Sequence, residues 1–214
     1  MAGCCHHDHD SGVFEGMDAG YKRRLQAVIA INAAMFLVEM TAGHLAGSQA
    51  LQADALDFLG DTLTYGLSLA VIGASVRIRA GAALAKGLSL TAMGLWVAGS
   101  TAWKVYAGGV PDAPVMGVVG FLALAANAAS VLLLVKHKDG DANVRSVWLC
   151  SRNDAIGNVA VMLAAAGVWG TESAWPDLIV AGLMAALFVS SSVQILSQAI
   201  KEYRHKTEHE VAAE

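Results

Sequence analysis

The chain has 214 residues, of which 56% are hydrophobic and only 15% are charged, and its mean hydropathy is +0.51. An ordinary soluble domain of this length is less apolar, so the composition indicates an integral membrane protein. The formal net charge of -4 and the scattered short groups of Lys and Arg argue against a nucleic-acid-binding protein.

Residues 1–21 form an N-terminal tail that is rich in potential metal ligands. The ligands lie in one tract of Cys4, Cys5, His6, His7, Asp8 and His9. Short Cys- and His-rich tracts bind metals, and the glycine-rich flanks predict that this tail is disordered until a metal arrives. No apolar core flanked by basic residues is present, so we expect no cleavable signal peptide. The tail either collects metal on the cytoplasmic side or has no role in transport.

Six apolar segments follow the tail. A bilayer core of about 30 Å needs about 20 helical residues, and each segment reaches that length. They are predicted at 25–46, 49–76, 80–106, 115–135, 146–169 and 177–200. The connections are short and contain helix-breaking residues. The sequence therefore predicts an all-α integral membrane protein with a six-helix transmembrane domain over 22–200 and a short cytoplasmic tail over 201–214.

The basic residues occur at alternate connections. All but two of the 14 Lys and Arg residues lie before the first segment, around the second and fourth connections, or after the sixth segment. The exceptions are Lys104 and Arg152. Cytoplasmic loops hold an excess of positive charge, so both termini are predicted to be cytoplasmic. The absence of other targeting signals favours a bacterial-type inner membrane.

Two of the apolar segments carry polar residues at helical spacing. Asp54, Asp57 and Asp61 share one face of the second segment, and Cys150, Asp154 and Asn158 share one face of the fifth. Counted from the predicted ends, Asp57 and Asp154 each lie about 13 Å deep, near the middle of a bilayer. An aspartate at that depth costs roughly 2.5 to 3.5 kcal/mol on insertion scales, so these groups need a partner, water or a cation.

A divalent cation is one explanation for these acids. It would offset the repulsion between converging carboxylates. Oxygens with a Cys150 thiolate suit tetrahedral zinc or cadmium, whereas an octahedral all-oxygen set suits magnesium or manganese. Structural explanations stay open as well. The acids could pair with Arg152, Cys150 could be a small core residue, and Asn158 could bridge helices. Glu39 in the first segment could be an arginine partner or support the ligands.

The residues of three segments resemble a known family. The run from Asn32 and Glu39 through Gly43, Gly47 and Ser48 to the aspartates at 54, 57 and 61 resembles the first two helices of the cation diffusion facilitators. Residues 153–157 and 175–177 also resemble this family of zinc-transporter-type metal/proton antiporters. The resemblance implies a metal site of Asp57 and Asp61 with Cys150 and Asp154, and an internal similarity between the two helices offers Asn158 in place of Cys150. Asp54 is a further candidate. The chain resembles a short form without the family's soluble C-terminal domain.

The resemblance implies efflux of zinc, cadmium or cobalt across the membrane in exchange for protons, by alternating access. Such a transporter makes and breaks no chemical bond and needs no cofactor beyond the transported divalent ion, of which zinc is the first candidate. A homodimer through the membrane helices stays open. Two other functions remain as alternatives. One is a membrane-anchored metal sensor or adaptor without transport, and the other is a proton-coupled exporter of organic cations with aromatic residues such as Phe58 and Tyr65 in its cavity.

Overall fold

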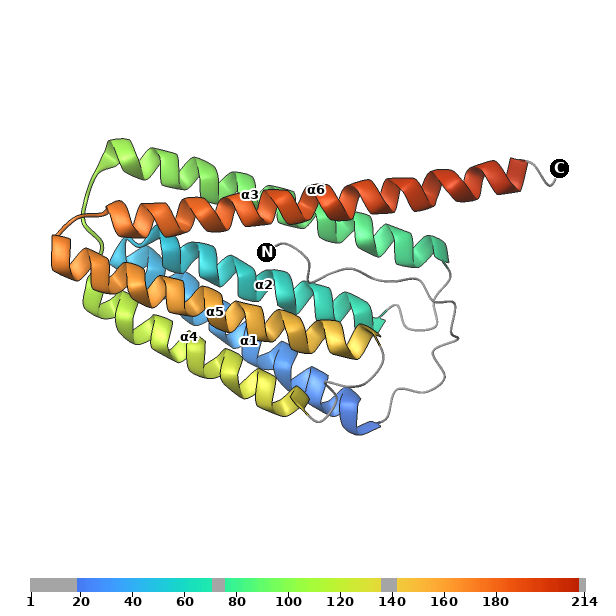
Figure 1. Ribbon diagram of the computed structural model, residues 1–214, viewed down its shortest axis with the longest axis horizontal. Coiled ribbons are helices and arrows are strands. Elements are labelled where there is room, and N and C mark those ends of the chain that lie inside the picture. Colours follow the sequence, from blue (N-terminus) through green and yellow to red (C-terminus); the bar gives the residue numbers. More distant parts are fainter. Residues whose placement is uncertain (1–18, 71–75, 136–141, 212–214) are drawn as a thin grey trace.

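The computed structural model describes residues 19–70, 76–135 and 142–211, which form six helices and short connections with no strand among them. The six helices run alternately up and down (Figure 1). They are α1 (Ala19–Ala46), α2 (Gln49–Ala70), α3 (Val76–Ala107), α4 (Ala113–Leu134), α5 (Ala142–Thr171) and α6 (Trp175–Val211).

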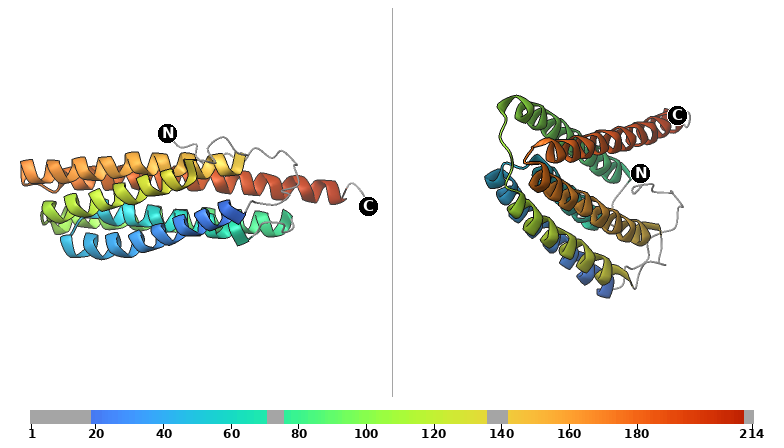
Figure 2. Two further views of the ribbon diagram at one scale, coloured as in Figure 1. Left: turned by 90° about the horizontal axis from the view of Figure 1, so that it is seen from below. Right: turned by 60° about the vertical axis from the view of Figure 1, so that its left-hand side comes forward.

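The helices form two groups. Helices α1, α2, α4 and α5 pack together, and α3 packs mainly against α6 (Figures 1 and 2). Two glycines, Gly87 and Gly94, allow α3 to approach α6 closely. A Cβ atom at Gly87 would lie 2.7 Å from Leu196 Cγ, and one at Gly94 would lie 2.9 Å from Val189 Cγ2. Small residues commonly provide such contacts between membrane helices. Helix α2 joins the groups because it also contacts α3 and α6.

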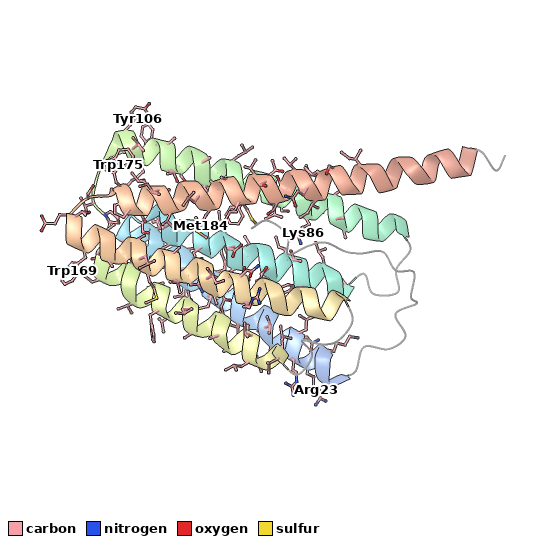
Figure 3. The ribbon with its side chains drawn as sticks, viewed as in Figure 1. Arg23, Lys86, Tyr106, Trp169, Trp175 and Met184 are labelled. Atoms are coloured by element: carbon pink, nitrogen blue, oxygen red, sulfur yellow. The ribbon has the colours of Figure 1, made fainter. Side chains whose placement is uncertain are left out.

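The two ends of the bundle differ in composition. At one end, which we call the turn end, the chain passes from α1 to α2, from α3 to α4 and from α5 to α6. Tyr106, Trp169 and Trp175 lie at the turn end, and all three are exposed (Figure 3). The opposite end, which we call the basic end, holds Arg23. Exposed Trp and Tyr are typical of residues at the water interfaces of a membrane, and basic residues are typical of the cytoplasmic interface.

Five helices are long and apolar enough to cross a membrane within the described ranges. The spans lie in α1, α3, α4, α5 and α6. These helices confirm the all-α architecture with multiple membrane-spanning segments. Helix α2 is not among the five, and it carries three aspartates in 22 residues. The prediction of one segment over 49–76 was wrong at its end, since α2 is described to Ala70 and Val76 already belongs to α3. Helix α6 continues to Val211, past the predicted limit near 200, because a helix need not stop at the lipid boundary.

The turn between α1 and α2 depends on two glycines. Gly47 has a φ of +68°, a left-handed conformation that ends many helices, and its N–H donates to the carbonyl of His44 at 3.2 Å. Gly43 faces α2, where an added Cβ would lie 3.0 Å from Leu51 Cβ. Gly47 therefore closes the turn, and Gly43 allows the close contact between α1 and α2.

Candidate metal-transport site

Helices α1 and α2 share a polar interface inside the apolar bundle. The side-chain amide of Asn32 donates to Asp61 Oδ2 at 3.4 Å. Seven residues further along α1, Glu39 lies within electrostatic range of Asp54 and Asp57. Glu39 is 0% exposed and Asp54 is 2% exposed. Neither oxygen of Glu39, nor Asp54 Oδ2, has a hydrogen bond of good geometry. Buried acids of this kind are costly unless another group or ion compensates them.

Helix α5 adds a second set of polar groups, and it contacts α2 directly. Asn158 is 0% exposed, and neither of its two side-chain polar atoms has a hydrogen-bond partner in the part of the chain that the structure describes. Asp154 is half-buried, as are Asp57 and Asp61 of α2, whereas Arg152 is exposed. Cys150 is a residue of α5, but its side chain lies outside the described part of the structure.

The packing of α2 against α5 indicates which polar residues lie at the same depth. Near the turn end, Ala50 and Leu51 of α2 share an apolar cluster with four residues of α5, centred between Ala164 and Ala165. The helices are antiparallel, so a step away from the turn end along α2 corresponds to a step back along the α5 sequence. Asp57 is as many residues from Ala50 and Leu51 as Asn158 is from the centre of the four α5 residues, so the two lie at about the same depth.

By the same count Asp61 is at about the depth of Asp154. Cys150 is one turn closer to the basic end, about 6 Å from Asp154 along the axis at 1.5 Å per residue. The depth comparison thus favours Asp154 and Asn158 over Cys150 as the counterparts of Asp57 and Asp61.

The acids do not close around a single point in this conformation. Within the described residues, no three His, Cys, Asp or Glu side chains come together in a group that could hold a metal ion. The tail residues Cys4, Cys5, His6, His7, Asp8 and His9 lie outside the described residues. Both aromatic residues considered for an organic-cation cavity are buried, and Tyr65 packs in an apolar cluster with Leu25, Val28 and Leu134. Tyr65 is therefore part of the apolar core of the bundle.

The polar residues of α1 are a part of the site that the sequence analysis did not include among the metal ligands. The spacing of Asn32 and Glu39, seven residues apart, places both on one helical face and was a usable signal for a polar stripe. The structure shows that this stripe faces the aspartates of α2.

Comparison with known proteins identifies the family. A family model described as the cation efflux transmembrane domain matches residues 25–202, most of the chain. The chain belongs to the cation efflux family. This result confirms the resemblance to the cation diffusion facilitators, and the apolar helices and bacterial relatives confirm a multi-pass protein of the bacterial inner membrane.

Three relatives of this cation efflux protein carry the names of cation efflux systems or of a zinc transporter. It is 23% identical to the metal cation efflux system protein CzcD of Cupriavidus metallidurans, over 92% of the chain and 66% of that protein. It is 25% identical to the cation efflux system protein CzcD of an Alcaligenes species, over 83% of the chain and 58% of that protein. It is 27% identical to the zinc transporter ZitB of Pectobacterium atrosepticum, over 92% of the chain and 66% of that protein. The chain thus spans between 58% and 66% of the length of these relatives.

Proposed function

We propose that this cation efflux protein exports divalent transition-metal ions, zinc foremost with cadmium or cobalt as alternatives, across the inner membrane in exchange for protons. The observation that carries the proposal is the set of buried polar groups on α1, α2 and α5 inside an apolar bundle. The face of α5 includes Asn158, which is fully buried with both of its polar atoms unpartnered. Buried polar groups without partners are rare in folded proteins, and a transported ion would give them one.

We assign the metal ligands to Asp57 and Asp61 of α2 and to Asp154 and Asn158 of α5. The depth comparison supports this set over one with Cys150, which is one helical turn nearer the basic end in the sequence of α5. Four oxygen donors are enough for a tetrahedral zinc ion. Asp54 lies about one turn from Asp57 toward the turn end, beside Glu39, so we place these two acids on the exit side of the site.

Helix α2 is the sixth transmembrane helix in this proposal. It is too polar to pass as a membrane span by composition alone, but its acidic face is turned into the bundle. Asp54 is 2% exposed, and Asp57 and Asp61 are half-buried. Acids that face the inside of a helical bundle avoid most of the cost of contact with lipid. With the basic end in the cytoplasm, both termini are cytoplasmic and the turn end faces outward.

The exchange of metal for protons follows from the chemistry of the ligands. A carboxylate must lose its proton before it coordinates a metal, so binding from the cytoplasm releases protons. On the outer side, protons compete for the same aspartate oxygens and displace the metal. A carrier that opens its site alternately to the two sides therefore couples the metal and proton fluxes.

Zinc uptake by everted membrane vesicles tests the proposal. Respiring vesicles should accumulate radioactive zinc, and a protonophore should abolish the accumulation. Asp57→Ala and Asp154→Ala should each lower the rate at least about tenfold, because each removes a ligand from the ion. The control is Asp112→Asn, which changes an exposed aspartate at the turn end that caps α4. Uptake at the parental rate by either alanine variant contradicts the ligand assignment. Zinc binding without uptake by the parental protein favours the sensor or adaptor.

A further inference from the structure

One buried carboxylate lies outside the proposed ligand set. Asp177, in the first turn of α6, is 0% exposed and accepts three hydrogen bonds from the start of α2. Ser48 Oγ donates to Asp177 Oδ1 at 2.6 Å, Gln49 N donates to Oδ2 at 2.8 Å, and Ala50 N donates to Oδ1 at 3.0 Å. We call these four residues the turn-end latch.

The turn-end latch satisfies the N-terminus of α2. The first N–H groups of a helix have no partner within it, and they carry the positive end of the helix dipole. Asp177 takes the N–H groups of Gln49 and Ala50, and Ser48 Oγ takes that of Leu51 at 3.1 Å. A carboxylate has several lone pairs for such donors, so this side chain can be fully buried with both of its oxygens hydrogen-bonded.

The turn-end latch also joins the two groups of helices. Asp177 belongs to the α3–α6 pair, and its three donors belong to the α1–α2 turn and the first residues of α2, in the other group. From the turn end toward the basic end, α6 diverges from α2 and α5 (Figures 1 and 2). In the described structure these hydrogen bonds join the two groups at the turn end, where the proposed transporter would release its ion. An apolar cluster joins them as well, in which Ala53 and Leu56 of α2 pack with Ala181 and other residues of α3 and α6.

We propose that Asp177 is a positioning residue that keeps the turn end closed while metal enters from the basic end. This inference rests on the proposed export by alternating access. Opening of the turn end requires α6 to leave the start of α2 and so to break the three hydrogen bonds of the latch. The latch sets how often the site faces outward, although Asp177 itself binds no metal.

Asp177→Asn tests this role, because the amide keeps the size of the side chain but loses the charge and one acceptor oxygen. The reporter is Ala181→Cys, one turn further along α6 and 0% exposed. An impermeant maleimide, added outside intact cells, should label this cysteine slowly in the parental background and about tenfold faster with Asp177→Asn, the change expected from the loss of one strong hydrogen bond. The native Cys150 lies toward the basic end, away from the reagent.

Two controls separate a latch from general unfolding. Asp112→Asn removes the charge of an exposed capping side chain that bonds only within its own helix, where Val115 N donates to Asp112 Oδ1 at 3.0 Å, and it should leave the labelling of Ala181→Cys unchanged. Val28→Cys reports on a fully buried position of α1, and its labelling in everted vesicles should not rise with Asp177→Asn. An equal rise at both reporters, or no rise at Ala181→Cys, overturns the inference.

Transport kinetics give an independent test. If fewer carriers face the cytoplasm, the apparent KM for zinc in everted vesicles rises in inverse proportion to that fraction. Asp177→Asn should therefore raise KM, by up to about tenfold, whereas partial unfolding alone should lower Vmax with KM unchanged. A variant with lower Vmax and unchanged KM contradicts the latch. Labelling needs no transport, so faster labelling together with an active Asp57→Ala variant would refute the proposed site and leave the latch standing.

Discussion

Replacing Asn158 should weaken zinc binding and at the same time stabilise the fold. Asn158 is 0% exposed and both of its polar atoms lack hydrogen-bond partners. A buried unsatisfied polar group costs about 1–3 kcal/mol, and leucine has a similar volume without that cost. We therefore expect Asn158→Leu to raise the free energy of unfolding of the metal-free protein by about 1 kcal/mol or more. Loss of a ligand should lower zinc affinity at least about tenfold, which is about 1.4 kcal/mol of binding free energy.

The two effects have opposite signs, so they can be measured separately on the purified protein. Thermal unfolding without metal reports the first, and isothermal titration with zinc reports the second. Cys150→Ala is the matched comparison, because Cys150 is one turn nearer the basic end and should leave zinc affinity within about twofold of the parental value. A large loss of affinity in Cys150→Ala with normal affinity in Asn158→Leu would refute the depth comparison between α2 and α5.

Two further predictions concern the helix pair and the tail. Gly94→Ala should destabilise the protein by about 1–3 kcal/mol in thermal unfolding, because the new Cβ would lie 2.9 Å from Val189 Cγ2 and 3.3 Å from the backbone N of Val189. Gly99→Ala, with nothing within 4 Å of the added atom, should cause no loss, and equal effects would contradict the close α3–α6 packing. Replacing residues 4–9 by a glycine–serine linker should raise the KM for zinc about threefold with Vmax unchanged, since a collector raises the local metal concentration. Unchanged KM would show that the tail has no role in transport.

The helices could be predicted from the sequence because lipid imposes a simple requirement on length and polarity. Apolar segments of the required length indicated the six helices, and Gly47 and Ser48 marked the turn between the first two. The polar face of α2 followed from the spacing of Asp54, Asp57 and Asp61. These features depend on neighbours within one or two helical turns, so a local pattern is sufficient to find them.

The features that the sequence did not reveal depend on contacts between distant segments. Asp177 is 129 positions from Ser48, and nothing local to either residue indicates that one caps the helix of the other. The choice between Cys150 and Asn158 depends on the axial register of α2 against α5. The packing of Ala50 and Leu51 against α5 sets this register. The depth of Asp154 was estimated from a predicted helix start at 146, which put Asp154 level with Asp57. Helix α5 is described from Ala142, about one turn earlier, so that estimate of depth changes by one turn.

The number of protons released per zinc ion bound is the most direct test of the central claim that α2 and α5 hold an exchangeable divalent ion. The measurement uses the purified protein with residues 4–9 replaced, in a weakly buffered solution with a pH indicator. We predict one zinc site per chain and release of about one to two protons per ion near neutral pH, with both signals lost in Asp57→Ala and in Asp154→Ala. Zinc binding that releases no protons, or that persists unchanged in both variants, would contradict the claim.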